Sequence, residues 1–138
     1  MTDISFTRTG YWAHVGIEAV SVGSGAAVAR VRLEGKHLGV DHSVHGGAIS
    51  SVVDAAAGLA VRSLRSEEEM ARRPHATTDL HVTYIGPPAG CELIARSTVV
   101  REGRAAFFVE VPVSDESGSA IGRGSAIFVV VSEKTGGR

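Results

Sequence analysis

The chain has 138 residues, enough for one domain that buries a core without disulfide or metal support. We expect a single domain over 1–138 with its core at about 15–132. Fourteen basic and fifteen acidic residues give a formal net charge of -1, which excludes the strong positive field that recruits nucleic acid or an anionic membrane. Cys91 is the single cysteine, no signal-peptide pattern opens the sequence, and no apolar run approaches the roughly 20 residues that span a bilayer. These features predict a soluble, cytoplasmic protein.

The first predicted elements are two strands in residues 17–33. A Gly-Ser-Gly turn at 23–25 separates two strand-like runs, and the second run alternates apolar or small residues with Arg30 and Arg32. Residues 34–45 show no periodicity. A long run without proline then predicts a helix from about Gly46 to about Leu64.

One side of this helix is predicted to face a core. At 100° per residue, a stripe within about 60° of its centre contains Ile49, Val52, Val53, Ala56, Ala60 and Leu64. The opposite side carries small residues around one carboxylate, namely Ser50, Ser51, Asp54, Ala57 and Gly58. Because the mixture of Lys and Glu typical of a solvated helix face is absent, we expect both sides to be covered and Asp54 to be sheltered.

Four further strands are expected after a charged, exposed stretch at 66–74. They fall at 76–86, 91–103, 104–113 and 119–131, with a hairpin tip at Glu102 and Gly103. Pro112 within the third of these runs indicates an edge position or a bulge. Two strands, one long helix and four strands predict an α+β fold in which an antiparallel sheet wraps around one central helix.

Two segments resemble a known family: HGGAISSVVDAAAGLA at 45–60 and VVREGRAAFFVEVPVSDESGSAIGRGSA at 99–126. With the order of elements, they resemble the hotdog-fold acyl-CoA thioesterases of the phenylacetyl-CoA (PaaI-like) branch of the 4-hydroxybenzoyl-CoA thioesterase superfamily. The resemblance covers roughly residues 15–132. It implies hydrolysis of an acyl-CoA thioester without a cofactor, by a homodimer or homotetramer with active sites at the subunit interface.

The resemblance also implies roles for single residues. Asp54 would act as general base or nucleophile on the thioester. A backbone N–H of Gly46 or Gly47 would hold the carbonyl oxygen. The hydroxyl of Thr77, which lies in the same predicted strand before the Thr-Tyr pair at 83–84, would help to place water.

One motif departs from the family. Its members often carry Asn six residues and Gly three residues before the histidine of the HGG motif, where this chain has Gly39 and His42. The role of that Asn is therefore missing or supplied differently, with Asp41, His42 and His45 as candidates.

The residue types themselves suit thioester hydrolysis. Gly46 and Gly47 at a helix start expose unpaired N–H groups at the positive end of the helix dipole, which is the arrangement of an oxyanion hole. The simpler explanation is a tight turn into the helix. For Asp54, the simpler explanation is a buried carboxylate that neighbouring hydroxyls satisfy.

The spacing of these residues adds a constraint. Asp54 follows Gly46 by eight residues, about 12 Å along a helix at 1.5 Å per residue. One chain cannot place both groups on one thioester carbon. The spacing therefore predicts an obligate dimer, in which a second subunit brings its own helix alongside.

Other polar residues allow more than one interpretation. Thr77 and Thr78 point to opposite faces of a strand, and the count back from residues 83–84 favours Thr77, although a β-branched residue also simply suits a strand. His81 is either structural or lines the acyl pocket. Three histidines and one aspartate lie close together in the loop before the helix: His37, Asp41, His42 and His45. Their spacing matches no compact metal-ligand motif, so we expect no metal. His45 is instead expected to pack behind the glycine pair.

The phosphates of CoA require basic residues along their path. The candidates are Arg101, Arg104 and Arg123 with His42, and Arg72 and Arg73 beside Pro74 are further ones. Each arginine is also explained as a solvated charge on a strand, hairpin or loop.

Two alternative functions stay open. A hotdog dehydratase or hydratase resembles a different pattern, in which the acid lies further from its histidine than the nine residues between His45 and Asp54. A non-catalytic module that binds acyl-CoA would lack the acid or the glycine pair. The acyl group, the choice between nucleophile and general base, and the choice between dimer and tetramer also stay open.

Overall fold

The computed structural model describes residues 4, 8 and 10–133. The helical elements are α1 (Gly10–Val15), the 3-10 turn η2 (Gly35–His37), α2 (Gly46–Arg62) and α3 (Glu67–Arg72). The strands are β1 (Ile17–Gly23), β2 (Ala26–Arg32), β3 (His75–Tyr84), β4 (Glu92–Glu102), β5 (Ala106–Ser114) and β6 (Ala120–Val130). None of the helices in this described part combines the length and apolar character that a membrane crossing requires.

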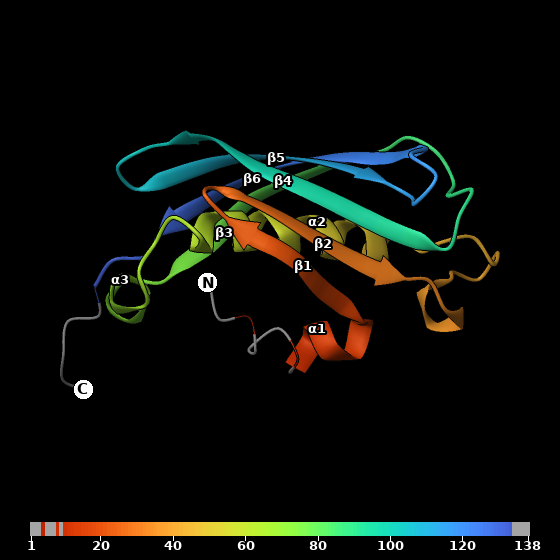
Figure 1. Ribbon diagram of the computed structural model, residues 1–138, viewed down its shortest axis with the longest axis horizontal. Coiled ribbons are helices and arrows are strands. Elements are labelled where there is room, and N and C mark those ends of the chain that lie inside the picture. The colour runs from red at the N-terminus through yellow and green to blue at the C-terminus, as the bar shows by residue number, and fades with distance from the viewer. Residues whose placement is uncertain (1–3, 5–7, 9, 134–138) are drawn as a thin grey trace.

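The six strands form one antiparallel sheet in the order β1-β2-β4-β5-β6-β3. Figure 1 shows the sheet curving over α2, which lies along its inner side. The predicted α+β architecture, an antiparallel sheet around one central helix, is confirmed.

The core lies between α2 and the inner face of the sheet. The predicted stripe of α2 is buried from Ile49 to Ala60, and Leu64 is half-buried just beyond the helix end. Alternate residues of β5 meet it, because side chains of a strand point to opposite faces in turn. Those buried on the inner side are Phe107, Val109, Val111 and Val113.

Gly124 lets α2 approach β6 closely. A Cβ atom at this position would lie 2.3 Å from Cγ1 of Val53, closer than carbon atoms can approach. Gly122 lies two residues earlier on the same face, and its Cβ would stand 3.5 Å from Cγ2 of Ile49. Gly124 therefore permits the close approach of the helix to the sheet, whereas a Cβ atom at Gly122 would make only an ordinary contact with Ile49.

Three local expectations need correction or refinement. Helix α2 ends at Arg62, two residues earlier than predicted, and a tight turn follows. The charged stretch contains α3, where Oγ of Ser66 accepts a hydrogen bond from the N–H of Glu69 at 3.1 Å and caps the first turn. The edge position for Pro112 is wrong, because β5 lies between β4 and β6. Pro112 itself pairs with Arg123, and the nearest bulge leaves Ile121 of β6, opposite Val113 and Ser114, as the extra residue.

Asp115 fastens the loop between β3 and β4 to the turn that follows β5. Its buried carboxylate accepts the N–H groups of Ala89 and Gly90 at 2.7 and 2.9 Å. The hydroxyl of Ser117 donates to its other oxygen at 2.6 Å. These hydrogen bonds, that from Ser117 first, hold the pKa of Asp115 well below its usual range.

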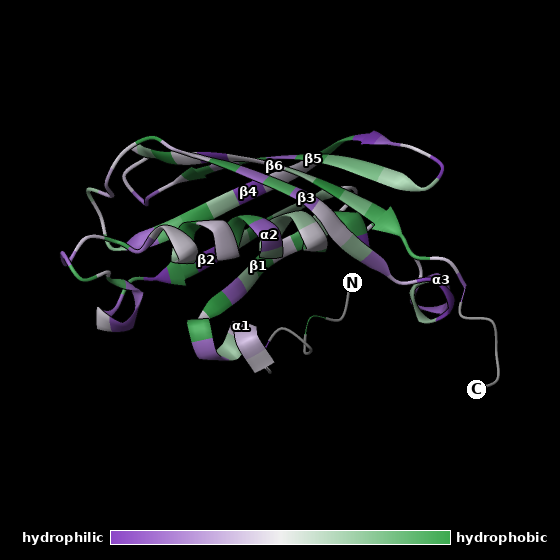
Figure 2. Ribbon diagram, turned by 180° about the vertical axis from the view of Figure 1, so that it is seen from behind, coloured by the Kyte–Doolittle hydropathy of each residue, from purple (hydrophilic) through white to green (hydrophobic). Residues whose placement is uncertain are grey.

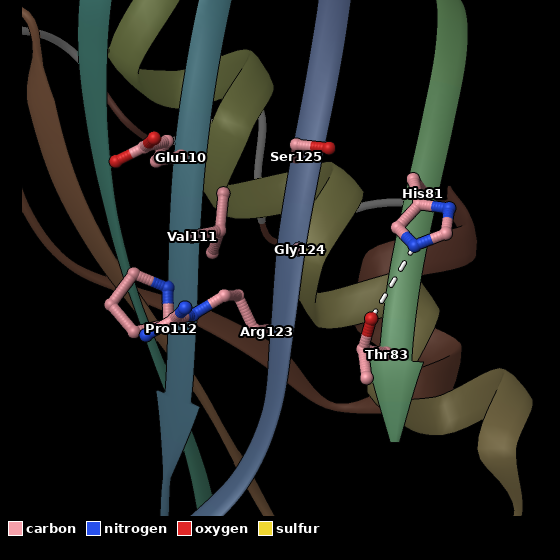
Figure 3. Close-up of a pocket in the computed structure, with 8 residues that line it drawn as sticks. All are labelled: His81, Thr83, Glu110, Val111, Pro112, Arg123, Gly124 and Ser125. Carbon is pink, nitrogen blue, oxygen red and sulfur yellow. Dashed lines mark hydrogen bonds between the residues drawn. The ribbon is translucent and has the colours of Figure 1, made fainter. Parts of the chain in front are cut away.

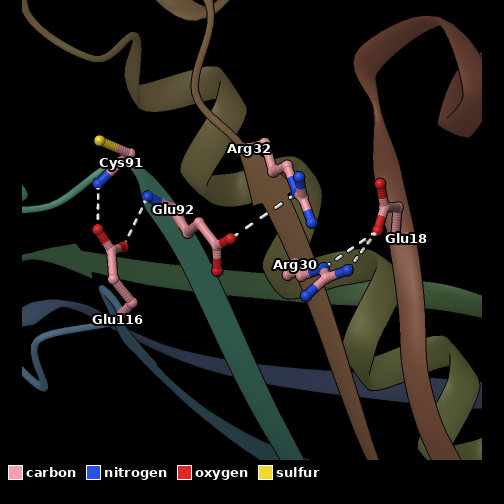
Figure 4. Close-up of polar contacts among 6 residues, drawn as sticks. All are labelled: Glu18, Arg30, Arg32, Cys91, Glu92 and Glu116. Atoms are coloured by element: carbon pink, nitrogen blue, oxygen red, sulfur yellow. Dashed lines mark hydrogen bonds and ion pairs between the residues drawn. The ribbon is translucent and has the colours of Figure 1, made fainter.

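Glu116 extends this clamp to the start of β4. Its two carboxylate oxygens accept the N–H groups of Cys91 and Glu92, as Figure 4 shows. The side chain of Glu92 lies 3.8 Å from Arg32 on β2, in an exposed ion pair of small energetic weight. The backbone contacts of Glu116 therefore matter more for the loop than the ion pair does.

Candidate active site

Asp54 and Thr77 lie together on the exposed side of α2. Oγ1 of Thr77 on β3 donates a hydrogen bond to Oδ1 of Asp54 at 2.7 Å. Asp54 is half-buried, while Thr77 is exposed. The hydroxyl therefore fixes one carboxylate oxygen, and among the described residues no donor occupies the other.

A bulge in β3 separates the roles of the two threonines. The pairing with β6 shifts register between Thr77 and Asp79, so Thr78 is the extra residue. Oγ1 of Thr78 donates to the carbonyl of Ile127 at 3.2 Å, in contact with the strand backbone only. The structure thus places Thr77, and not Thr78, against Asp54.

The start of α2 carries the two glycines. His45 is the N-cap residue, and its Nδ1 accepts the N–H of Gly47 at 2.8 Å. Within the described residues, the N–H of Gly46 has no acceptor. Gly46 therefore offers the free donor at this helix end, and the imidazole of His45 occupies the donor of Gly47.

Tyr84, at the end of β3, holds the same helix start from the other side. Its hydroxyl donates to the carbonyl of Gly46 at 3.2 Å. A Cβ atom on Gly46 would lie 3.2 Å from Cε1 of this ring. Sequence reasoning used Tyr84 only to count positions and missed this contact, which joins residues 38 positions apart.

The preceding loop contains no arrangement for a metal among its described residues. His37 is buried and structural, since its Nδ1 accepts the N–H of Glu34 at 2.9 Å and its Nε2 lies 2.5 Å from the carbonyl of Val15. Asp41 accepts both the hydroxyl and the N–H of Ser43, which lowers its pKa. Within the described part of the chain, no group of three or more His, Cys, Asp or Glu side chains could hold a metal ion.

The position that holds Asn in many family members also belongs to this loop. The N–H of Gly39 donates to the carbonyl of Ser43 at 2.7 Å and closes the loop. His42 is exposed with a φ of 63°. A Cβ atom on Gly39 would lie 3.9 Å from the ring of His45, so the loop lies beside the helix start.

Gly46 and Asp54 lie on the same helix, two turns apart, as the sequence predicts. Figure 2 shows the exposed side of α2 between β3 on one side and β1 with α1 on the other. The hydroxyl of Tyr11 on α1 lies 2.6 Å from that of Ser51, between the two groups. At about 12 Å of helix length, one chain does not bring Gly46 and Asp54 together.

The edge strand β3 is exposed along almost its whole length. In the described chain it pairs only with β6, and its outer edge has no neighbour. Leu80, Tyr84 and Ile85 are 38%, 54% and 55% exposed on or next to this strand. An unpaired edge flanked by exposed apolar side chains is suited to pairing with another chain.

The predicted CoA-binding arginines are scattered. Arg123 lies on the outer face of the sheet in a cleft of about 330 Å³ with His81 and Thr83, as Figure 3 shows with α2 behind the strands. Arg101 is exposed near the end of β4, and Arg104 lines a separate cleft beside α3. The sheet therefore separates Arg123 and His81 from Asp54 of the same chain.

Comparison with known proteins identifies the family. Residues 42–121 match the model of the Thioesterase superfamily, and the chain belongs to this family. A Halobacterium salinarum protein that carries the provisional name of esterase is 39% identical over 90 residues, 59% of this chain and 58% of that protein. The human acyl-coenzyme A thioesterase 13 is 24% identical over 110 residues, 78% of this chain and 75% of that protein.

Solved structures share the fold. A mutant form of the phenylacetic acid degradation protein PaaI from Thermus thermophilus superposes with a TM-score of 0.76, at 20% identity, over 86% of this chain and 96% of that one. The resemblance to PaaI-like hotdog thioesterases that the sequence indicates is thus confirmed, in family by the superfamily match and in fold by this neighbour.

Proposed function

We propose that this protein hydrolyses an acyl-CoA thioester to a free acid and CoA, with Asp54 as its central catalytic group. The hydrogen bond of 2.7 Å between Thr77 and Asp54 is the observation that carries the proposal. It holds a carboxylate in a fixed orientation at the rim of an open face, as a general base or a nucleophile requires. Membership of the thioesterase superfamily supports the same chemistry.

The carboxylate has two routes to the products. As a general base, Asp54 takes a proton from water, the water oxygen attacks the thioester carbon, and the carbon–sulfur bond breaks to release the CoA thiolate. As a nucleophile, Asp54 attacks the carbon itself and expels the CoA thiolate, and water then hydrolyses the resulting anhydride to the free acid and the Asp54 carboxylate. In either route Thr77 keeps one carboxylate oxygen in place.

The N–H of Gly46 stabilises the oxyanion that forms on the thioester carbonyl. Among the described contacts it is the unpaired donor at the start of α2, and the helix dipole adds positive charge there. Tyr84 fixes the peptide unit that follows by its hydrogen bond to the carbonyl of Gly46. His45 supports the turn by capping Gly47, and it does not contribute a proton in this scheme.

Two chains build each site. Because Gly46 and Asp54 of one chain lie about 12 Å apart, the donor for one Asp54 comes from the antiparallel α2 of a second chain. Pairing of the exposed β3 edges would bring two such helices together and cover the apolar side chains beside them. The active unit is therefore at least a homodimer, with two sites related by its twofold axis.

Release of free thiol from a panel of aryl and straight-chain acyl-CoA thioesters tests the proposal. We expect turnover by the wild type and a loss of at least about a hundredfold in Asp54→Asn, equivalent to about 2.7 kcal/mol of barrier. Glu68→Gln removes an exposed carboxylate of α3 and should keep full activity. Equal rates for the wild type and Asp54→Asn would remove Asp54 from the mechanism. Absence of turnover on every thioester, with CoA still bound, would favour the non-catalytic binding module.

A further inference from the structure

A cleft of about 300 Å³ opens at the end of α2 opposite the helix start. The loop after α2, helix α3, the tip of the β4–β5 hairpin and the end of β6 surround it, and Figure 1 shows α3 and this hairpin tip at the same end of the molecule. Its apolar lining consists of Leu64, Phe107 and Val130. Its charged lining consists of Arg65, Arg72, Arg73 and Arg104, with Glu69 and Glu102.

The arginines of this cleft are not neutralised by its carboxylates. Four guanidinium groups face two carboxylates, and no ion pair among the described residues joins them. Arg72 pairs instead with Glu133 at 3.4 Å, and Arg65 is tied to the carbonyl of Arg73 at 2.5 Å. Within the described chain the side chain of Arg104 makes no hydrogen bond or ion pair, and Arg73 uses only its Nε, toward the carbonyl of Val131. Two arginines therefore keep donors for a ligand.

The pKa of His75 responds to the positive charges at this end of the molecule. Burial first, and then the charges of Arg65 and Arg62, lower the pKa of His75 to about 4. The neutral ring lies with Nδ1 at 3.0 Å from Arg65. Of these groups Arg65 lines the cleft, and a cleft lined by guanidinium charges is suited to an anion and not to a cation.

The distance from Asp54 to the cleft matches the length of the arm that joins the sulfur of CoA to its first phosphorus. Eleven residues from Asp54 to Arg65 correspond to about 16 Å of helix and turn. The four residues from Thr77 back to Arg73, at the end of α3, correspond to at most about 13 Å of extended chain. The arm of CoA has about 13 bonds between its sulfur and its first phosphorus. Since an extended residue covers three bonds in at most about 3.6 Å, the extended arm spans about 16 Å.

We infer that this cleft holds the phosphorylated nucleotide of CoA, with Arg73 and Arg104 on the phosphates and Leu64, Phe107 and Val130 under the adenine. The inference rests on the proposed hydrolysis, which places the thioester at Asp54. The pantetheine arm then runs from Asp54 along the half-buried side of α2, past Gly58, toward the loop after the helix. The outer-face cleft of Arg123 lies behind the sheet and does not continue this path.

The test compares one acyl group on two carriers, CoA and pantetheine, which lacks every phosphate. In Arg73→Gln and Arg104→Gln, we expect KM for acyl-CoA to rise about tenfold while KM for acyl-pantetheine changes by less than about twofold. Adenosine 3′,5′-bisphosphate should inhibit the wild type competitively and these variants about tenfold more weakly. Arg96→Gln, an exposed arginine on β4, is the charge-matched control and should match the wild type on both substrates.

Several results would overturn the inference. These are an equal rise of KM on both carriers, unchanged KM in both variants, or a selective rise in Arg123→Gln alone. If the wild type hydrolyses neither thioester, the proposed function fails. Calorimetric titration with adenosine 3′,5′-bisphosphate then tests independently whether the cleft binds the nucleotide. Tenfold weaker binding by Arg104→Gln then supports an anion site there, and equal binding rejects it.

Discussion

The two sides of α2 differ in what they contribute. The side against the sheet is apolar and tightly packed, to the point that β6 needs Gly124 beside Val53. The exposed side carries Asp54 and the free N–H of Gly46 between small residues. The packed side therefore contributes to stability, and the proposed function assigns the chemistry to the other side. Substitutions on the two sides should separate these properties.

The largest effect is expected from Gly46→Pro. This position is the first residue of α2, where proline is tolerated, and His45 before it has extended backbone angles that proline accepts. The substitution removes the N–H and leaves the helix, so kcat should fall roughly a hundredfold to a thousandfold. Steady-state kinetics and thermal unfolding measure the two properties.

Gly46→Ala is the matched control for that variant. It adds a Cβ atom against the same ring of Tyr84 but retains the N–H. Its kcat should stay within a few-fold of the wild type. A comparable loss in both variants would attribute the effect to crowding of Tyr84 and not to the missing donor.

Gly124→Val tests the buried side. Its Cβ atom would lie 2.3 Å from Val53, so the free energy of unfolding should fall by about 1–3 kcal/mol. Urea denaturation provides the measurement. Ser125→Val, one residue on and facing outward, should change stability by less than about 0.5 kcal/mol. Equal stability of Gly124→Val and the wild type would show that α2 does not press on β6.

Thr77→Val should slow catalysis about tenfold to a hundredfold, because a hydrogen bond to a charged group contributes about 1.5–3 kcal/mol. Thr78→Val alters only a contact with the backbone and should leave kcat unchanged. The rates of the two variants, measured at saturating substrate, distinguish the neighbours. If Thr78→Val loses more activity than Thr77→Val, the placement of water involves the other face of β3.

The smallest effect concerns His75. Its folded pKa of about 4 lies below the ordinary value of 6.5, so the unfolded chain binds a proton first as pH falls. The stability that neutral His75 contributes is present above pH 6.5 and is lost as pH falls toward 4. The loss should be about 1–2 kcal/mol, because the ring stays partly exposed. In urea denaturation, the free energy of unfolding of His75→Gln should depend less on pH over this window than that of the wild type. Parallel pH curves for the two proteins would show that His75 does not cause this loss of stability.

The sequence predicts the parts of this fold that depend on local patterns. The apolar stripe of α2 repeats over several turns, and the strands carry runs long enough to recognise. Helix α3 was missed because six residues provide less than two turns of pattern, although Ser66 and three following glutamates form an ordinary helix start.

The site was predictable only where it follows from spacing within one element. Gly46 and Asp54 lie on one helix, so their separation could be calculated. Tyr84 and Gly46 meet across 38 residues, and the sheet order brings Arg73 and Arg104 to one cleft. Such contacts depend on long-range packing, for which periodicity carries no information. The count back from residues 83–84 favoured Thr77, but the bulge that accompanies its contact with Asp54 is not revealed by alternation.

The separation of Gly46 and Asp54 along α2 has a genetic consequence. If each site takes its donor from one chain and its acid from the other, Gly46→Pro and Asp54→Asn are complementary lesions. A mixed dimer of the two inactive proteins collects both defects in one site and leaves the other intact. Random reassortment of equal amounts should therefore restore about one quarter of the wild-type sites.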